Sequence, residues 1–246
     1  GCVTVSGELW ALLLEAQRWS ERTDGLFDVT IAPLSRLWRW SARRGALPGP
    51  ERIHAARAAV GFVDLTLDAV DPCVTFERPG MSLDLGGIAK GFAADAMLAI
   101  LKRHGIEAAL IDAGGDIVVG APPPSFRGWL VALPGGDSLR IANAAIATSG
   151  DTERHVLVDG VRYAHIVDPR TGFGVIDAPT VTVVAPTGTS ADVLASVLII
   201  MDPPDARALV RRIGEVWVRS LGDADWTAGS LPMHAWPEQQ TPFPHR

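Results

Sequence analysis

The segment 82–95, with the sequence SLDLGGIAKGFAAD, combines glycines, one lysine and two acids between a short apolar run and an expected helix. Gly86, Gly87 and Gly91 allow the backbone to take positive φ and to approach a ligand closely. The amides that open the following helix point toward a phosphate placed there, and Lys90 adds a mobile positive charge. This combination is typical of a site for an anionic cofactor.

The spacing differs from the two common glycine-rich phosphate motifs. In a P-loop the lysine follows the last glycine and precedes serine or threonine, whereas here Lys90 precedes Gly91. The segment does not match GxGxxG either. Taken alone, it is equally consistent with a glycine-rich turn that leads into an amphipathic helix carrying one solvated lysine.

A second group of polar residues lies in SADVLASVL, residues 190–198. Ser190 is a good helix N-cap, and Asp192 and Ser196 stand four residues apart, so they share one face of the helix. A carboxylate and a hydroxyl are hard oxygen donors of the kind that Mg2+ accepts. The alternative is structural, because an acid is favoured in a first helical turn and a mid-helix serine can bond its i−4 carbonyl.

A histidine in YAHIVDPRTG is the candidate base. His165 stands at the end of an expected short strand, before a polar turn that holds Asp168, Arg170 and Thr171. Histidine is the side chain most readily used as a base near neutral pH. A lone histidine beside apolar residues is also commonly structural, and His155 competes for the same role.

The elements that position these residues follow from hydrophobic periodicity. Apolar residues recur at helical spacing after residue 8, and Pro33 permits a new helical turn. The segment TDGLFDVTIAPL between them is expected to be extended. We predict helices over residues 8–22, from Pro33, over 51–60, over 91–103 and from near Ser190.

Strand signals separate these helices. Residues 64–77 alternate around a DAVDP turn and predict a hairpin, 107–111 predict a buried strand, and 180–185 a further strand. Residues 129–161 contain short strand signals separated by turns at PGGD, TSGD and VDG, a pattern typical of an antiparallel sheet. We therefore predict an α+β fold, a single compact unit of mixed, largely antiparallel sheets with flanking helices, with room for two lobes.

Composition narrows the function classes. The chain has 246 residues and is 48% hydrophobic, which is typical of an ordered globular protein. Its net charge of −6 argues against a protein that binds nucleic acid irrespective of sequence. The longest apolar run, 193–201, is too short to cross a bilayer, so no transmembrane segment is expected. We assign residues 1–221 to the main domain and 222–246 to a Pro-, Gln- and Trp-rich tail.

Two cysteines, Cys2 and Cys73, are too few for a metal cluster, and their spacing leaves open whether they pair. Cys2 would be a lipidation site only if a lipoprotein signal preceded it. The sequence begins at Gly1 without a methionine, and no targeting signal is visible in it, so the compartment is unknown. We expect a periplasmic or membrane-associated protein if an upstream signal exists, and a cytoplasmic one otherwise.

Six motifs, taken together and in order, carry a resemblance. They are TDGLFDVTIAPLSRLW, LDLGGIAKGFAAD, DAGGDIVVG, IATSGDTER, HIVDPRTG and VTVVAPTGTSADVLASVL. In this order and wording they resemble the ApbE family of FAD:protein FMN transferases, over about residues 3–201. The resemblance covers most of the chain.

The resemblance implies an activity. Members of the family bind FAD with Mg2+, cleave its pyrophosphate and transfer FMN to a Thr or Ser hydroxyl of a partner protein, releasing AMP. The implied partners are FAD and an acceptor protein that carries a flavinylation motif. Two alternatives use the same site: an FAD pyrophosphatase that gives FMN and AMP, and a non-catalytic FAD-binding protein.

The resemblance also implies roles for single residues. His165 aligns with the family histidine that deprotonates the acceptor hydroxyl. The metal ligands would be the backbone carbonyl of Gly87 and the side chains of Asp192 and Ser196, the latter where threonine is common. The implied nucleotide contacts are Leu26, Phe27, Asp28, Asp84, Lys90 and Val167.

Family members usually carry a further N-terminal region before the segment matched here, with residues that help enclose the flavin. From this difference we expect either a longer natural chain or an open flavin pocket. The N-terminal difference bears on catalytic competence more than on the fold.

Overall fold

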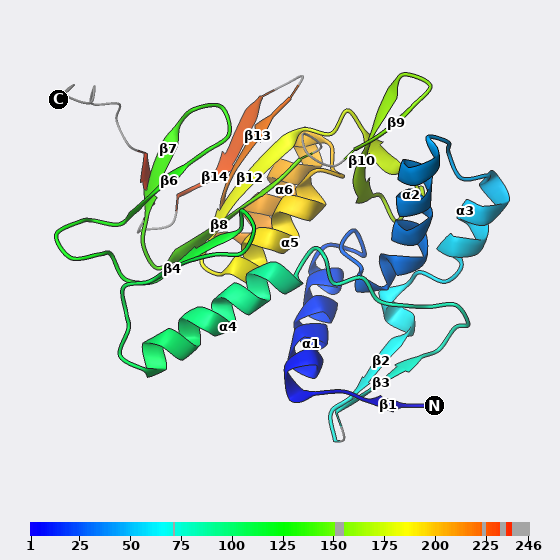
Figure 1. The fold of residues 1–246 in the computed structure, drawn as a ribbon, viewed down its shortest axis with the longest axis horizontal. Helices are drawn as coiled ribbons and strands as arrows, with labels where there is room; N and C mark the ends of the chain where they lie inside the picture. The colour runs from blue at the N-terminus through cyan, green and yellow to red at the C-terminus, as the bar shows by residue number, and fades with distance from the viewer. Residues whose placement is uncertain (71, 151–154, 223–224, 232–234, 238–246) are drawn as a thin grey trace.

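A six-stranded antiparallel sheet forms the centre of this computed structural model, which describes residues 1–70, 72–150, 155–222, 225–231 and 235–237 (Figure 1). Its strands are β4 (Leu110–Asp112), β5 (Ile117–Val119), β8 (Ala144–Ser149), β12 (Thr180–Ala185), β13 (Trp217–Leu221) and β14 (Trp226–Gly229). Neighbouring strands follow the order β14-β13-β12-β8-β5-β4. The central strands β8 and β12 are largely buried, which explains their nearly continuous apolar sequences.

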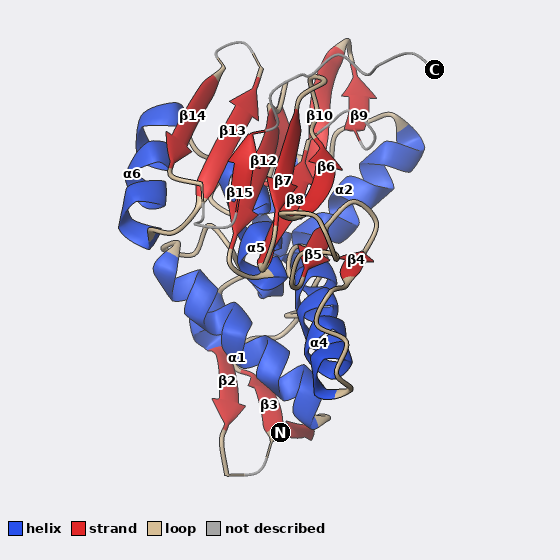
Figure 2. Ribbon diagram, turned by 90° about the vertical axis from the view of Figure 1, so that its left-hand side faces the viewer, coloured by secondary structure: helices blue, strands red, loops and turns tan. Residues whose placement is uncertain are grey.

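The two faces of this sheet are covered differently (Figure 2). Val181 and Val183 of β12 pack into the main core with the helices, whereas Val184 faces a second small sheet. This alternation is the period-two pattern of a strand buried on both sides. The second sheet consists of β6 (Trp129–Ala132), β7 (Ser138–Ile141) and β15 (Ala235–Pro237). The helices of the main core are α1 (Gly7–Arg22), α4 (Ala89–Arg103), α5 (Gly188–Leu198) and α6 (Pro203–Ile213).

A smaller layer with its own apolar cluster stands beside this core (Figure 1). Trp38 is its anchor, because its ring centroid lies 5.3 Å from that of Tyr163 and 6.0 Å from that of Phe173. The indole N–H of Trp38 donates to the carbonyl of Gly172 at 2.8 Å. The layer contains α2 (Ala32–Arg44), α3 (Pro50–Arg57), and the sheet β11-β10-β9, made of β9 (His155–Val158), β10 (Val161–Val167) and β11 (Gly174–Ile176).

The N-terminal strand is held by a disulfide. Cys2 pairs with Cys73, with 5.6 Å between their Cα atoms, and β1 (Val3–Thr4) pairs with β3 (Cys73–Phe76), which forms the predicted hairpin with β2 (Leu65–Asp68). The pairing that the spacing left open is thereby decided. A cysteine in a disulfide has no free thiol for a lipid.

The predicted α+β class is confirmed, with antiparallel pairing in every sheet of the described residues. Of the helices in this part of the chain, none is both long and apolar enough to span a bilayer. The division between residues 1–221 and a tail stays a prediction. Within that tail, however, β14 pairs with β13 and β15 pairs with β7, so these segments belong to the sheets.

Three local expectations were wrong. The segment 23–34 is not extended: it forms a turn, a short 3-10 helix η1 (Val29–Ile31) and the start of α2, because the Asp28 side chain caps η1. Ser190 is not the N-cap of α5, which starts nearby at Gly188: the cap is Thr187, whose hydroxyl accepts from the Ser190 amide at 3.2 Å. Strand β4 lies at the sheet edge and is largely exposed rather than buried. A second 3-10 helix, η2, spans Phe62–Asp64.

Helices α4 and α5 pack closely at two glycines. A β-carbon on Gly91 would overlap the carbonyl of Gly188, so the two backbones touch only because that carbon is absent. The Asp95 carboxylate of α4 accepts hydrogen bonds from the amides of Gly188 at 2.7 Å and Thr189 at 2.8 Å. These contacts set the register between the glycine motif and the helix that carries Asp192.

Gly91→Ala is expected to lower the free energy of unfolding by about 3 kcal/mol, because overpacking a tight interior forces backbone shifts. Urea denaturation measures the difference. The matched control is Gly7→Ala, since a β-carbon at Gly7 meets no atom within 4 Å, and we expect a change of less than about 1 kcal/mol there. Equal effects of the two substitutions would show that the α4–α5 contact is not tight.

Candidate functional site

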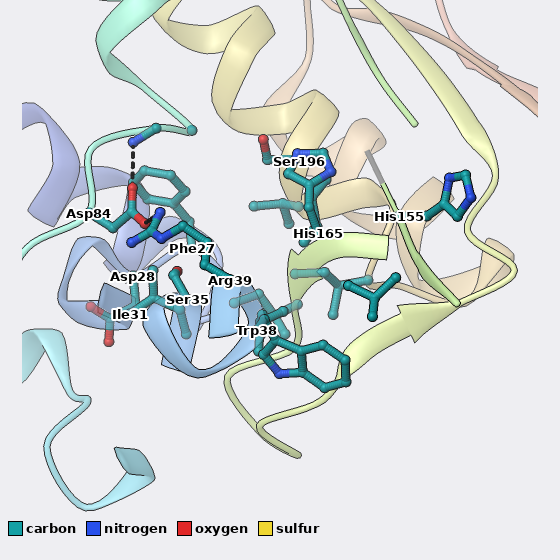
Figure 3. Close-up of a pocket in the computed structure, with 18 residues that line it drawn as sticks. Phe27, Asp28, Ile31, Ser35, Trp38, Arg39, Asp84, His155, His165 and Ser196 are labelled. Atoms are coloured by element: carbon teal, nitrogen blue, oxygen red, sulfur yellow. Dashed lines mark hydrogen bonds and ion pairs between the residues drawn. The ribbon is translucent and has the colours of Figure 1, made fainter. Parts of the chain in front are cut away.

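A cavity of about 450 Å³ opens where α2, the glycine motif, β10 and α5 meet (Figure 3). It draws residues from four separate parts of the chain. Its lining residues are Leu26, Phe27, Asp28, Ile31, Ser35, Trp38, Arg39, Asp84, Gly86, Gly87, His155, Val156, His165, Ile166, Val167, Ser196, Val197 and Ile200.

The predicted site residues converge on this cavity with two exceptions. Lys90 and Asp192 are not among the lining residues: Lys90 lies on the first turn of α4, three residues after Gly87, and Asp192 lies just after the first turn of α5. Asp192 stands one helical turn before Ser196, which does line the cavity. The lining members of the predicted set are Leu26, Phe27, Asp28, Asp84, Gly87, His165, Val167 and Ser196.

Gly87 brings the glycine motif against α5. A β-carbon placed on Gly87 would lie 3.3 Å from the hydroxyl oxygen of Ser196 and 3.4 Å from Cε2 of Phe27. The main chain of Gly87 is therefore a direct neighbour of the Ser196 hydroxyl. Among the hydrogen bonds of the described residues none uses that hydroxyl, whereas Ser20 donates to the carbonyl of Ala16, as a mid-helix serine commonly does.

Lys90 lies between two buried carboxylates. Its ammonium forms an ion pair with Asp116 and lies 3.5 Å from Oδ1 of Asp192, and both aspartates are only 3% exposed. The Gly91 amide donates to Oδ2 of Asp192 at 3.2 Å. Sequence reasoning missed Asp116, although it is the second acid of the DAGGDIVVG motif. Its proximity to Lys90 depends on β5 lying beside α4.

The environment of Asp192 disfavours its charge. Burial, and then the negative charge of Asp116, raise the pKa of Asp192 to about 6, against the opposing effects of Lys90 and the Gly91 amide. The two aspartates and one lysine together carry one uncompensated negative charge when all are ionised. A cation added here would relieve it.

The donors at this point fit Mg2+. The carbonyl of Gly87, the Asp192 carboxylate and the Ser196 hydroxyl are hard oxygen ligands, and Mg2+ takes few protein ligands and fills its other positions with water and phosphate. Within the described residues, no three His, Cys, Asp or Glu side chains come together as a metal site. A metal at this wall would therefore use backbone and hydroxyl oxygens as well as Asp192.

The Asp28 carboxylate accepts hydrogen bonds from residues of its own loop and from Phe62. Its Oδ1 accepts from the amide and hydroxyl of Thr30 at 2.7 and 2.6 Å, and its Oδ2 accepts from the Phe62 amide at 2.9 Å. Burial raises the pKa of Asp28, and the hydrogen bonds from Thr30 and Phe62 oppose that rise. The carboxylate thus fixes the loop that presents Leu26 and Phe27 to the cavity.

Asp84 and Arg39 face one another at the cavity wall (Figure 3). Oδ1 of Asp84 accepts from the Gly86 amide at 3.0 Å, and Oδ2 lies 3.3 Å from Nη1 of Arg39. Arg39 was missed by sequence reasoning. No motif marks it, and its place in the cavity follows from how α2 packs against β10.

The two histidines lie on neighbouring strands. His165 is on β10, within an irregular stretch of pairing between Tyr163 and Val167, and His155 opens β9 opposite Ala164. In the view of Figure 3 the His165 ring lies toward Ser196, while His155 is farther from it. Both line the cavity. Residues 151–154 of the IATSGDTER motif lie outside the described residues.

The turn after β10 is stiffened by an ion pair. Asp168 is 9% exposed, and its two carboxylate oxygens accept from Nε and Nη2 of Arg170 at 3.0 and 2.9 Å. Such a bidentate pair is geometrically specific. It fixes the end of the strand that carries His165 and Val167.

Comparison with known proteins identifies relatives. The sequence model of the ApbE family matches residues 1–218. The FAD:protein FMN transferase of Treponema pallidum is 33% identical over 231 residues, and the match covers 85% of this chain and 64% of the relative. The enzyme of the same name from Vibrio cholerae is 34% identical over 208 residues, and the match covers 80% of this chain and 62% of the relative. The chain thus spans less than two thirds of these relatives.

Solved structures are similar over nearly the whole chain. The ApbE protein from Thermotoga maritima superposes with a TM-score of 0.83 at 31% identity, covering 94% of this chain and 78% of that one. The flavin transferase ApbE from Vibrio cholerae gives a TM-score of 0.81 at 29% identity, covering 93% and 77%. These structures share the fold described above.

Proposed function

The chain belongs to the ApbE family, and from this premise we propose that it transfers FMN from FAD to a Thr or Ser hydroxyl of an acceptor protein. The observation that supports this most is the single cavity that collects Asp84, Gly87, His165 and Ser196 from distant parts of the chain. Relatives named FAD:protein FMN transferase agree with it.

In the proposed reaction His165 takes the proton of the acceptor hydroxyl. The hydroxyl oxygen then forms a bond to the phosphorus of the FMN portion, and the bond from that phosphorus to the oxygen of the AMP phosphate breaks. AMP leaves with the electron pair of that bond. The protein forms no covalent bond to the substrate in this scheme, so its catalytic contribution is mainly positioning of the reactants and neutralisation of charge.

Gly87, Asp192 and Ser196 would hold Mg2+ at the end of the cavity nearest α5. Bound there, the metal supplies charge neutralisation at the pyrophosphate oxygens. Lys90 lies between Asp116 and Asp192 next to this position, where its charge offsets part of the repulsion between the two buried carboxylates.

The remaining wall suits a flat aromatic ring. Leu26, Phe27, Ile31 and Trp38 give the cavity apolar lining on the side of α2, and the loop that holds Phe27 is fixed by Asp28. Cofactor sites are commonly apolar with a few placed polar groups. We therefore place the isoalloxazine against Leu26, Ile31 and Trp38, and the pyrophosphate beside Gly87, which Phe27 adjoins.

The test mixes the protein with FAD, Mg2+ and an acceptor carrying the sequence D-x-x-[ST]-[GA]-[AST]-[ST]. We expect a covalently flavinylated, fluorescent acceptor band and release of AMP. Free FMN and AMP formed without acceptor would instead identify an FAD pyrophosphatase. Tight FAD binding without any product would identify a non-catalytic flavin-binding protein, and failure to bind FAD would rule out all three.

A further inference from the structure

We propose that Arg39 is an anion-binding residue of the cavity, where its guanidinium contacts a phosphate of the bound nucleotide. This inference rests on the proposed function for the identity of that nucleotide. Arg39 lies on α2, and among the described lining residues it is the only Lys or Arg. The carboxylates of Asp28 and Asp84 line the same cavity, so a phosphate entering it needs a nearby cation.

Lys90 does not by itself provide the cation that a phosphate in the cavity needs. Its ammonium is engaged by the buried carboxylates of Asp116 and Asp192, and it is not among the residues that line the cavity. Its positive charge is matched by theirs. Arg39 is placed differently, because its guanidinium lies at the cavity wall itself (Figure 3).

The present contact of Arg39 is weak enough to exchange. Its Nη1 lies 3.3 Å from Oδ2 of Asp84, and the Arg39 side chain is 61% exposed. Exposed ion pairs of this kind contribute little to stability. Asp84 does not depend on it, since its Oδ1 accepts from the Gly86 amide and its own amide donates to the carbonyl of Val29 at 2.8 Å.

A guanidinium suits the incoming ligand. Its planar fork of N–H donors matches phosphate oxygens in a bidentate manner, which an ammonium cannot reproduce. When a phosphate arrives, Arg39 turns from Asp84 to the phosphate, while Asp84 keeps its bond to Gly86. The free protein therefore holds the arginine close to its place of use.

The same helix offers a matched control. Arg36, three residues earlier on α2, is also exposed but is directed to the hydroxyl of Ser82 and the carbonyl of Ala32, and it does not line the cavity. Arg36→Gln removes the same charge from the same helix. It should therefore report any effect of overall charge alone.

The experiment titrates FAD, FMN and riboflavin by flavin fluorescence, and AMP by calorimetry, into the wild type, Arg39→Gln, Arg39→Lys and Arg36→Gln. For Arg39→Gln we expect FAD binding to weaken by about tenfold or more, as for a lost charge-assisted hydrogen bond, with riboflavin binding unchanged. The FAD affinity of Arg39→Lys should lie between those of the wild type and Arg39→Gln, and the FAD affinity of Arg36→Gln should match that of the wild type. Whichever of FMN and AMP also weakens identifies the phosphate contacted.

Two failures are distinguishable. If the wild type binds FAD and Arg39→Gln binds FAD, FMN and AMP equally well, the inference about Arg39 is wrong and the proposed function stands. A parallel loss of riboflavin binding in Arg39→Gln would also contradict it, because that pattern means a damaged cavity. If the wild type binds no flavin, both proposals are wrong.

Discussion

Replacing His165 by alanine is expected to slow transfer of FMN to the acceptor by about 10²- to 10⁴-fold, the usual contribution of a positioned general base. FAD binding should change by less than about threefold, since the proposed role of His165 is in the proton transfer and not in holding the nucleotide. The reason is geometric: His165 lines the same cavity as Ser196, beside which the reacting phosphate is placed. Single-turnover flavinylation with prebound FAD measures the step directly.

His155→Ala is the matched control for this substitution. His155 lies on the adjacent strand and lines the same cavity, so it shares residue type, sheet and exposure to solvent. We expect it to retain transfer within about tenfold of the wild type. If His155→Ala is the variant that loses transfer while His165→Ala keeps it, the two histidines exchange roles and the assignment of the base is wrong.

Replacing Asp192 by asparagine is expected to reduce Mg2+-dependent transfer by at least about 10²-fold, because a metal ligand that carries charge is lost. The concentration of Mg2+ that gives half-maximal activity should rise as well. Activity measured across a Mg2+ titration gives both quantities. Asp112→Asn is the control, because Asp112 is an exposed acid at the end of β4 and, within the described part of the chain, its side chain accepts a hydrogen bond only from the Gly115 amide, at 2.7 Å.

The same substitution should stabilise the metal-free protein. The pKa of Asp192 is raised from 3.8 to about 6, so between these values the folded protein binds the proton more tightly than the unfolded chain does. The corresponding contribution to stability is fully present below about pH 4 and is lost as the pH rises through about 6. An asparagine side chain in place of Asp192 carries no charge, which leaves Lys90 paired with Asp116 alone.

Urea denaturation in EDTA tests this effect. Above about pH 6 we expect the variant Asp192→Asn to be more stable than the wild type by on the order of 2 kcal/mol, and the difference to vanish near pH 4. Adding Mg2+ should stabilise the wild type and not the variant. A variant that is less stable than the wild type at pH 8 in EDTA would show that the Lys90 contact outweighs the cost of burying the charge.

Most of the residues that the sequence nominated for the site line one cavity, and their roles stay a prediction; the contacts among them were not foreseen. Sequence reasoning placed Gly87 and Ser196 together through a resemblance, and the structure brings the Gly87 main chain next to that hydroxyl. The hydrophobic periodicity of the sequence also agrees with helix α4, with the β2–β3 hairpin, and with the strands β9 and β10 that carry the two histidines. The segment 23–34 was expected to be extended and is not, because the Asp28 side chain caps the 3-10 helix η1 within it.

The residues that no pattern identified are those whose role depends on distant partners. Asp116 is buried beside Lys90, which precedes it by 26 residues, because β5 lies against α4. Arg39 reaches the cavity because Trp38, its neighbour, is anchored to β10 and the Gly172 carbonyl. Cys2 and Cys73 are 71 residues apart, and two cysteines in a sequence say nothing about their separation in space.

By itself the sequence determined the family, the class of fold and the chemical types gathered at the site, because turn glycines, helical spacing and motif order are local properties of the chain. Only the tertiary structure decided which charges meet. The direction of a side chain such as Lys90 or Arg39 depends on how its helix packs against a neighbour, and that packing is the sum of many contacts far apart in sequence.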